Sequence, residues 1–355
     1  MKKSVIKYFL AANSGEGFIS KFGSCYNPID GWKAYIIKGG PGTGKSSFMK
    51  YIVKKADEKN IKYIMSPCSS DPHSLDAVIF PELKAVIMDG TSPHTVEPIL
   101  PGLSDSILNF GEFWDDSLLE NKEIIKLTQK NKALHRTASQ YIQTAGKLTQ
   151  ENYNTALSFT DIKKATFFAE KMYKRYIPPK KGDSFEWEYY LSGITPDGIV
   201  NLYDTPLIVC KTLIIVKDSY GVVSNTIMQT LKKKLKLGGY EFISLANPIL
   251  PSEITDHIII PELSLGFIRE DSFASIPTDK RRIRMERFSD QAGISSVKDK
   301  LKYNSLMCES LLNKASETLK HAKFVHDELE KHYINAMDFE KLQKFADKFA
   351  KKLFK

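Results

Sequence analysis

The chain repeats itself at a distance of about 180 residues, and this internal repeat is the feature that most constrains its fold. The segment YFLAANSGEGFIS from Tyr8 is similar to YYLSGITPDGIVN from Tyr189. Further along, IIKGGPGTGKSSFM from Ile36 aligns with IVKDSYGVVSNTIM from Ile215. A repeat of this length predicts two copies of one structural unit rather than two unrelated domains.

The repeat also separates residues that the fold needs from residues that a site needs. DAVIFPEL from Asp76 returns as DHIIIPEL from Asp256, so that the tripeptide Pro-Glu-Leu occurs at 81–83 and again at 261–263. Because the two halves share this tripeptide whatever their chemistry, we interpret Pro81, Glu82 and Leu83 as structural.

The first half contains a glycine-rich segment with the pattern G-x-x-x-x-G-K-S. It follows a strand-like run at 34–38 and opens a helix-like run. Glycines allow the backbone to turn its N–H groups toward phosphate oxygens, and the N-terminus of the following helix favours an anion. The sequence therefore predicts a nucleotide-binding loop made of Gly39, Gly40, Pro41, Gly42, Thr43, Gly44, Lys45, Ser46 and Ser47.

Two further predictions concern ATP and Mg²⁺ at this loop. Lys45 is expected to bridge the β- and γ-phosphates, and the Ser46 hydroxyl to ligate the metal. The run KAVIMDG places Asp89 after four apolar residues, as expected for the acid that holds Mg²⁺ from a neighbouring strand. Lys45 and Asp89 are thus the predicted catalytic residues, and Ser46 and Asp89 the predicted metal ligands.

The residue that would activate water is not apparent in this pattern. Hydrolytic P-loop enzymes often have a glutamate directly after the strand-end aspartate, but Gly90 stands there in this chain. Four nearby residues are candidates, although a surface or capping role is the more common one for each: Asp71, His73, His94 and Glu97.

The second half keeps the pattern of the fold and loses the residues of the site. Gly44, Lys45 and Ser46 are replaced by Val223, Ser224 and Asn225, Asp89 by Arg269, and Asp71 and His73 by Pro251 and Glu253. Valine lacks the backbone freedom of glycine, serine carries no charge, and an arginine would repel a divalent cation. The second half is therefore predicted not to bind Mg-nucleotide.

With these motifs the chain resembles a family of uncharacterised bacterial ATPases of the AAA/RecA-like type. Proteins of this family have two tandem P-loop modules with helical extensions. The resemblance covers nearly the whole chain and is carried by GGPGTGKSS, SDPHSLDAVIFPELKAVIMDGTSPH, PGLSDSILNFGEFWD, ITPDGIV and IIIPEL. It implies ATP binding. Members of that family carry an intact phosphate loop in the second half as well, and this chain departs from them there.

The predicted fold class is α/β, with two parallel-sheet cores that are each followed by a helical extension. The expected organisation is a core with an intact site at 1–99, a helical extension and linker at 100–184, a degenerate core at 185–280 and a C-terminal helical extension at 281–355. In the first core we expect strands near 34–38, 62–66, 77–80 and 85–88 and a helix at 46–59. The apolar positions expected to pack on the helices of 120–175, rather than form an oligomer, are Leu301, Met307, Leu311, Leu319 and Leu329.

The predicted function is a P-loop ATPase with one Mg-ATP site in the first half. A nucleotide-dependent interaction module with little or no hydrolysis stays open, as does a small-molecule kinase, although no basic lid is evident. An arginine that stabilises the transition state could come from Arg136, Arg175, Arg269 or the cluster at 281–287, across a pseudo-two-fold interface between the halves.

Charge and cysteine content restrict the partners and the compartment. The net charge of +9 comes mostly from scattered lysines, which favours solvated surfaces over nucleic-acid binding. No apolar stretch approaches the roughly 20 residues of a membrane span, and Lys7 interrupts the short apolar run near the start. We therefore expect a cytoplasmic protein in which Cys25, Cys68, Cys210 and Cys308 are free thiols. The macromolecular partner and the oligomeric state are left open.

Overall fold

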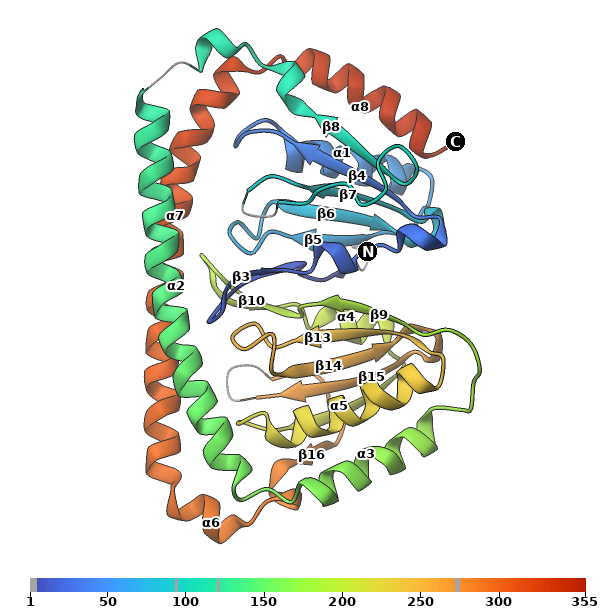
Figure 1. Ribbon diagram of the computed structural model, residues 1–355, viewed down its shortest axis with the longest axis vertical. Coiled ribbons are helices and arrows are strands. Elements are labelled where there is room, and N and C mark those ends of the chain that lie inside the picture. The colour runs from blue at the N-terminus through green and yellow to red at the C-terminus, as the bar shows by residue number, and fades with distance from the viewer. Residues whose placement is uncertain (1–4, 93–94, 120–121, 272–274) are drawn as a thin grey trace.

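The first half of the chain forms a six-stranded mixed sheet in a computed structural model, which describes residues 5–92, 95–119, 122–271 and 275–355 (Figure 1). The order is β1-β5-β6-β7-β4-β8. The bounds are β1 Ile6–Lys7, β4 Lys33–Lys38, β5 Ile64–Pro67, β6 Leu75–Phe80, β7 Ala85–Asp89 and β8 Asp105–Asn109. Helix α1 (Lys45–Glu58) follows β4. The four strands and the helix that the sequence predicts for this core lie where expected.

The second half forms a corresponding sheet in the order β16-β12-β15-β14-β13-β9. The bounds are β9 Phe185–Tyr189, β12 Thr212–Lys217, β13 Glu241–Ala246, β14 Thr255–Ile260, β15 Leu265–Glu270 and β16 Arg282–Arg284. Helix α4 (Asp204–Val209) precedes β12, and α5 (Val222–Leu237) follows it as α1 follows β4. Each half also has a small hairpin, β2 (Ala11–Ser14) with β3 (Gly17–Ser20) and β10 (Ser192–Thr195) with β11 (Gly198–Asn201). The fold is therefore α/β and duplicated.

The expectation of wholly parallel sheets is wrong, because one strand in each sheet is reversed. β6 runs antiparallel to β5 and β7, and β14 runs antiparallel to β13 and β15. The reason is the Pro-Glu-Leu tripeptide, which forms a short 3₁₀ turn at Pro81–Leu83 and again at Pro261–Leu263. The whole connection has four residues in each half, 81–84 and 261–264, which is enough to join antiparallel strands and too short for a parallel crossover. The structural interpretation of this tripeptide is confirmed.

The predicted core boundaries at 99 and 280 also need correction. β8 lies in the segment expected to be helical, yet it pairs with β4 in parallel. β16 likewise lies beyond residue 280 and pairs with β12. Both strands are short, and the helical periodicity farther along each extension concealed their strand signals.

The two halves face each other across a pseudo-two-fold axis, as predicted. Phe9 and Tyr190 exchange backbone N–H···O bonds of 2.9 Å each, and the rings of Tyr8 and Tyr189 stack with centroids 5.1 Å apart. One buried cluster combines apolar side chains from a face of each sheet, such as Ile36 in β4 and its counterpart Ile215 in β12. The halves therefore share one continuous core.

The helical extensions cross over to the opposite half, which the sequence did not predict. α2 (Lys122–Leu157) and α7 (Lys298–Ala336) lie antiparallel along one side of both sheets (Figure 1). α3 (Ile162–Tyr176) then packs on α5 of the second half, and α8 (Phe339–Leu353) packs on α1 of the first. Short α6 (Gln291–Ser296) precedes α7.

The expected packing of the C-terminal apolar stripe is confirmed in its middle part. Leu311 and Leu319 of α7 lie in a cluster with Ile142 of α2. Leu301 and Leu329 are also buried, whereas Met307 is exposed.

Candidate functional site

The glycine-rich loop, residues 39–44, connects β4 to α1 as the sequence predicts. Gly42 has φ 69° and Gly44 has φ 83°, a region of backbone conformation that favours glycine. No side chain caps the first turn of α1, which begins at Lys45. The N–H groups of this turn and the positive end of the helix dipole are therefore available to an anion.

Lys45 and Asp89 meet at the C-terminal edge of β4 and β7. Lys45 Nζ lies 3.7 Å from Asp89 Oδ2 and donates to the carbonyl of Gly40 at 2.7 Å. Asp89 Oδ1 accepts from the backbone N–H of Thr91 at 2.9 Å, which fixes the carboxylate. The lysine and the carboxylate are thus placed together, and both side chains are mostly buried.

The hydroxyl groups of the loop region have distinct partners. Ser46 Oγ accepts from the backbone N–H of Leu75 at 3.0 Å, and its remaining lone pair can still bind a cation. Thr43 Oγ1 donates to the carbonyl of Gly40 at 2.8 Å and so closes the loop on itself. Ser46 therefore suits the metal-ligand role predicted for it, whereas the Thr43 side chain supports the loop.

The loop opens into a cavity of about 870 Å³ that is formed jointly by the first half and the two long helices. The cavity size lies in the range typical of small-molecule sites. The sequence-predicted residues on its wall are Gly39, Pro41, Gly42, Thr43, Gly44, Lys45, Ser46, Ser47, Asp71 and Asp89. Residues that the sequence did not indicate are Lys132 and His135 of α2 and Lys323, His326, Glu330 and Tyr333 of α7.

The C-terminal end of α7 lies directly on the loop. A Cβ atom at Gly40 would come within 2.5 Å of the Tyr333 ring, and one at Gly42 within 2.7 Å of the Glu330 carbonyl. The backbone N–H of Gly42 also donates to Glu330 Oε1 at 3.3 Å. Gly40 and Gly42 are thus required for this contact as well as for the turn. Tyr153 and Tyr333 are also one repeat length apart in the sequence. This match was a signal for Tyr333, but it did not indicate which loop each tyrosine would contact.

The three described candidates for water activation do not gather at the loop. His73 is exposed and lies 3.6 Å from Asp197, and Glu97 is exposed and pairs with Lys38 at 2.7 Å. Asp71 does line the cavity, but its carboxylate accepts from the Ser74 hydroxyl and the His73 N–H within its own turn. His94 lies outside the described residues.

None of the proposed arginines lines the cavity in the part of the chain that the structure describes. Arg136 is exposed on α2, and Arg175 lies near the end of α3. Arg282 of the 281–287 cluster pairs with Glu270 at 3.0 Å. Arg269 is buried in the second half. The positive charges that do line the cavity belong to lysines: Lys45, Lys50, Lys132 and Lys323.

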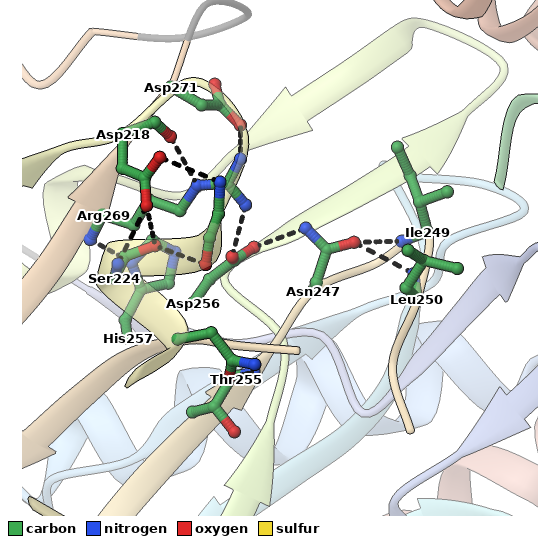
Figure 2. A network of polar contacts seen from close by, with 12 residues as sticks. Asp218, Ser224, Asn247, Ile249, Leu250, Thr255, Asp256, His257, Arg269 and Asp271 are labelled. Atoms are coloured by element: carbon green, nitrogen blue, oxygen red, sulfur yellow. Dashed lines mark hydrogen bonds and ion pairs between the residues drawn. The ribbon is translucent and has the colours of Figure 1, made fainter. Parts of the chain in front are cut away.

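The corresponding loop of the second half, residues 218–221, is closed by its own carboxylate (Figure 2). Asp218 accepts from the backbone N–H groups of Tyr220, Gly221 and Ser224 at 3.1, 3.0 and 2.9 Å. Val223 already lies within α5, whereas its equivalent in the first half, Gly44, has positive φ and precedes α1. The helix of the second half therefore begins earlier, and the loop before it is shorter. The donors that would face a phosphate are used inside the chain.

Arg269 completes this internal network from β15 (Figure 2). Its guanidinium donates to Asp256 Oδ1 at 2.6 Å and to the carbonyl of Asp218 at 3.0 Å, and it lies 3.8 Å from Asp271. Burial alone would lower the pKa of Arg269, but the Asp256, Asp271 and Asp218 carboxylates outweigh it and raise that pKa. A cavity of about 60 Å³ adjoins the network. That this half binds no Mg-nucleotide stays a prediction.

His257, next to Arg269, gives the second half a pH-dependent stability. Its Nδ1 accepts the backbone N–H of Arg269 at 3.0 Å, and burial, followed by the charge of Arg269, lowers its pKa from 6.5 to about 3. The folded protein therefore excludes a proton that the unfolded chain binds below pH 6.5. The stabilisation is complete above pH 6.5 and falls by up to about 1.4 kcal/mol per pH unit as the pH drops toward 3.

We expect His257→Asn to flatten this dependence, because asparagine can accept the same N–H without titrating. The free energy of unfolding, measured by urea titration between pH 7 and pH 4, should fall less steeply in the variant. Parallel profiles for parent and variant would contradict the assignment.

The remaining sequence-level expectations concern the thiols and the membrane. All four cysteines are free, as predicted. Among the described residues, no helix combines the length and the apolar character needed to cross a membrane. No family model matches the chain, and no curated protein or solved structure matches it. The resemblance to tandem P-loop ATPases therefore stays a prediction that depends on the motifs quoted above.

Proposed function

We propose that the chain binds one Mg-ATP at residues 39–47 and hydrolyses it. The observation that carries this proposal is the junction of the glycine-rich loop, the uncapped N-terminus of α1 and the Lys45–Asp89 pair at one wall of the 870 Å³ cavity. Uncapped N–H groups and a lysine suit a polyphosphate, and an adjacent carboxylate suits its divalent counter-ion.

Each predicted residue has a role in this proposal. Lys45 would give up its present contact with the Gly40 carbonyl and donate to oxygens of the β- and γ-phosphates. The backbone N–H groups of the loop would donate to oxygens of the same phosphates. Mg²⁺ neutralises phosphate charge, and the Ser46 hydroxyl and the Asp89 carboxylate would hold it. Within the described residues no three His, Cys, Asp or Glu side chains could form a metal site by themselves. Phosphate and water oxygens would therefore supply the other ligands.

A nucleotide-dependent interaction module is the second candidate. The contact of Glu330 and Tyr333 with the loop supports it, because α7 extends from this contact to the second half. Occupation of the loop would disturb the end of α7 directly. Release of phosphate distinguishes the two functions, and an acceptor-dependent transfer of phosphate would indicate a kinase instead.

Titration calorimetry tests the proposal. A non-hydrolysable ATP analogue with Mg²⁺ should bind with a stoichiometry near one, and adenosine should bind far more weakly. Absence of binding at millimolar analogue would refute the proposed function.

Asp89→Asn should separate nucleotide binding from metal dependence. The variant is expected to bind ATP in EDTA as well as the parent does, since the loop and Lys45 are intact. Addition of Mg²⁺ should strengthen binding in the parent and have little effect in the variant, because the amide is a poorer ligand for a hard cation. An equal Mg²⁺ effect in both proteins would remove Asp89 from the metal site.

A further inference from the structure

The cavity wall contains four carboxylates among the described residues, namely Asp71, Asp76, Asp89 and Glu330. Asp89 is held beside Lys45 at the strand edge, and Asp71 is used within its own turn. Asp76 is buried in β6, with only 3% of its surface exposed. Glu330 is the one whose carboxylate reaches a backbone donor of the glycine-rich loop.

The position of Glu330 is set by several contacts of α7. Its Oε1 lies 3.3 Å from the Gly42 nitrogen and 3.4 Å from His326 Nε2 one helical turn earlier. Tyr333, on the following turn, packs over Gly40 and has its ring 5.9 Å from that of Trp114. His326 on the same helix therefore orients the Glu330 carboxylate, and the N–H of Gly42 holds it at the loop.

The electrostatic surroundings keep this carboxylate charged. The hydrogen bond from His326 lowers the pKa of Glu330, and partial burial opposes that effect only in part. An ionised carboxylate beside a phosphate-facing donor can accept a proton from water.

We propose that Glu330 of α7 activates the water that attacks the γ-phosphate, in the role that Gly90 leaves vacant on the strand. This inference rests on the proposed ATPase function. A γ-phosphate and the carboxylate cannot share the N–H of Gly42, so Glu330 must move away from the loop when ATP binds. In this proposal the displaced carboxylate stays at the cavity wall and accepts a proton from a water molecule beside the γ-phosphorus.

The proton and electron balance of the step is simple. The water oxygen forms a bond to the γ-phosphorus, and the bond from that phosphorus to the β–γ bridging oxygen breaks. The electron pair of the broken bond stays on ADP. The water proton passes to the Glu330 carboxylate, which returns it to solvent after phosphate leaves.

Glu330→Gln tests the proposal, with Glu328→Gln as a matched control. Glu328 lies on the same helix, pairs with Lys331 and is not part of the cavity wall. Single-turnover release of ³²P from γ-labelled ATP should slow by about 10² to 10⁴ in Glu330→Gln and be unchanged in Glu328→Gln. ATP affinity should be equal or tighter in Glu330→Gln, because a negative charge beside the phosphates is removed.

Three results would overturn the inference, and they differ in whether ATP binding and hydrolysis remain supported. Tighter ATP binding by Glu330→Gln with an unchanged rate means that the carboxylate only competes with phosphate. A parent that binds ATP but releases no phosphate in a single turnover contradicts the role of Glu330 and leaves ATP binding intact. A parent that binds no ATP removes the proposed function together with the inference.

Discussion

Lys45→Ala is expected to abolish measurable ATP binding. Lys45 is the cation at the start of α1, and its ammonium already lies at the loop, 2.7 Å from the Gly40 carbonyl. Loss of its bonds to two phosphates would remove about 3 to 6 kcal/mol, which corresponds to roughly 10² to 10⁴ in affinity. Titration calorimetry with a non-hydrolysable ATP analogue provides the measurement.

Lys55→Ala is the matched control, because Lys55 lies on the same helix but pairs with Glu58 outside the cavity. Its affinity for the analogue should equal that of the parent. If Lys45→Ala bound as tightly as Lys55→Ala, the loop assignment would be wrong. If it retained one bound nucleotide per chain, residues 216–229 of the second half would have to bind ligand despite the internal Asp218 contacts.

Local sequence pattern predicted the parts of the fold that depend on near neighbours. The strands at 33–38 and 85–89, and the helix that begins at Lys45, follow from apolar runs and from glycines with positive φ. The reversed β6 was missed because hydrophobic pattern does not report strand direction. The Pro81–Leu83 connection contained that information, since its length excludes a parallel crossover.

The crossing of the helical extensions could not be predicted, and the missed part of the site depends on it. α8 packs on α1, about 300 residues earlier in the chain, through side chains such as Phe349 and Phe48. This packing brings the end of α7 over the loop and sets Glu330 beside Gly42. A charged residue in a lysine-rich helix looks like a solvated surface residue until the tertiary contact is known.

The repeat was more informative about chemistry than about packing. It identified Val223, Ser224 and Arg269 as replacements at positions where the first half has glycine, lysine and aspartate. It did not indicate that Asp218, in the place of Gly39, would bind the N–H groups of the second loop. In the second half the Asp218 carboxylate thus takes the place that a bound phosphate would have, and the fold is kept.

Arg269→Met should cause the largest loss of stability among the substitutions considered, about 3 to 5 kcal/mol. Arg269 is 7% exposed, and removal of its guanidinium leaves Asp256, which is 6% exposed, without its cationic partner. Methionine keeps much of the stem volume, so the loss should reflect an uncompensated buried charge rather than a cavity. The free energy of unfolding from urea titration at pH 7 is the measurement.

The double variant Arg269→Met with Asp256→Asn separates charge from packing. Because the amide removes the uncompensated charge, the double variant should be more stable than Arg269→Met alone, and the two substitutions should be strongly non-additive. Arg281→Met, at an exposed arginine, should change the free energy of unfolding by less than about 0.5 kcal/mol. Additive losses in the double variant would show that Arg269 stabilises the second half by packing, and that its ion pair with Asp256 contributes little.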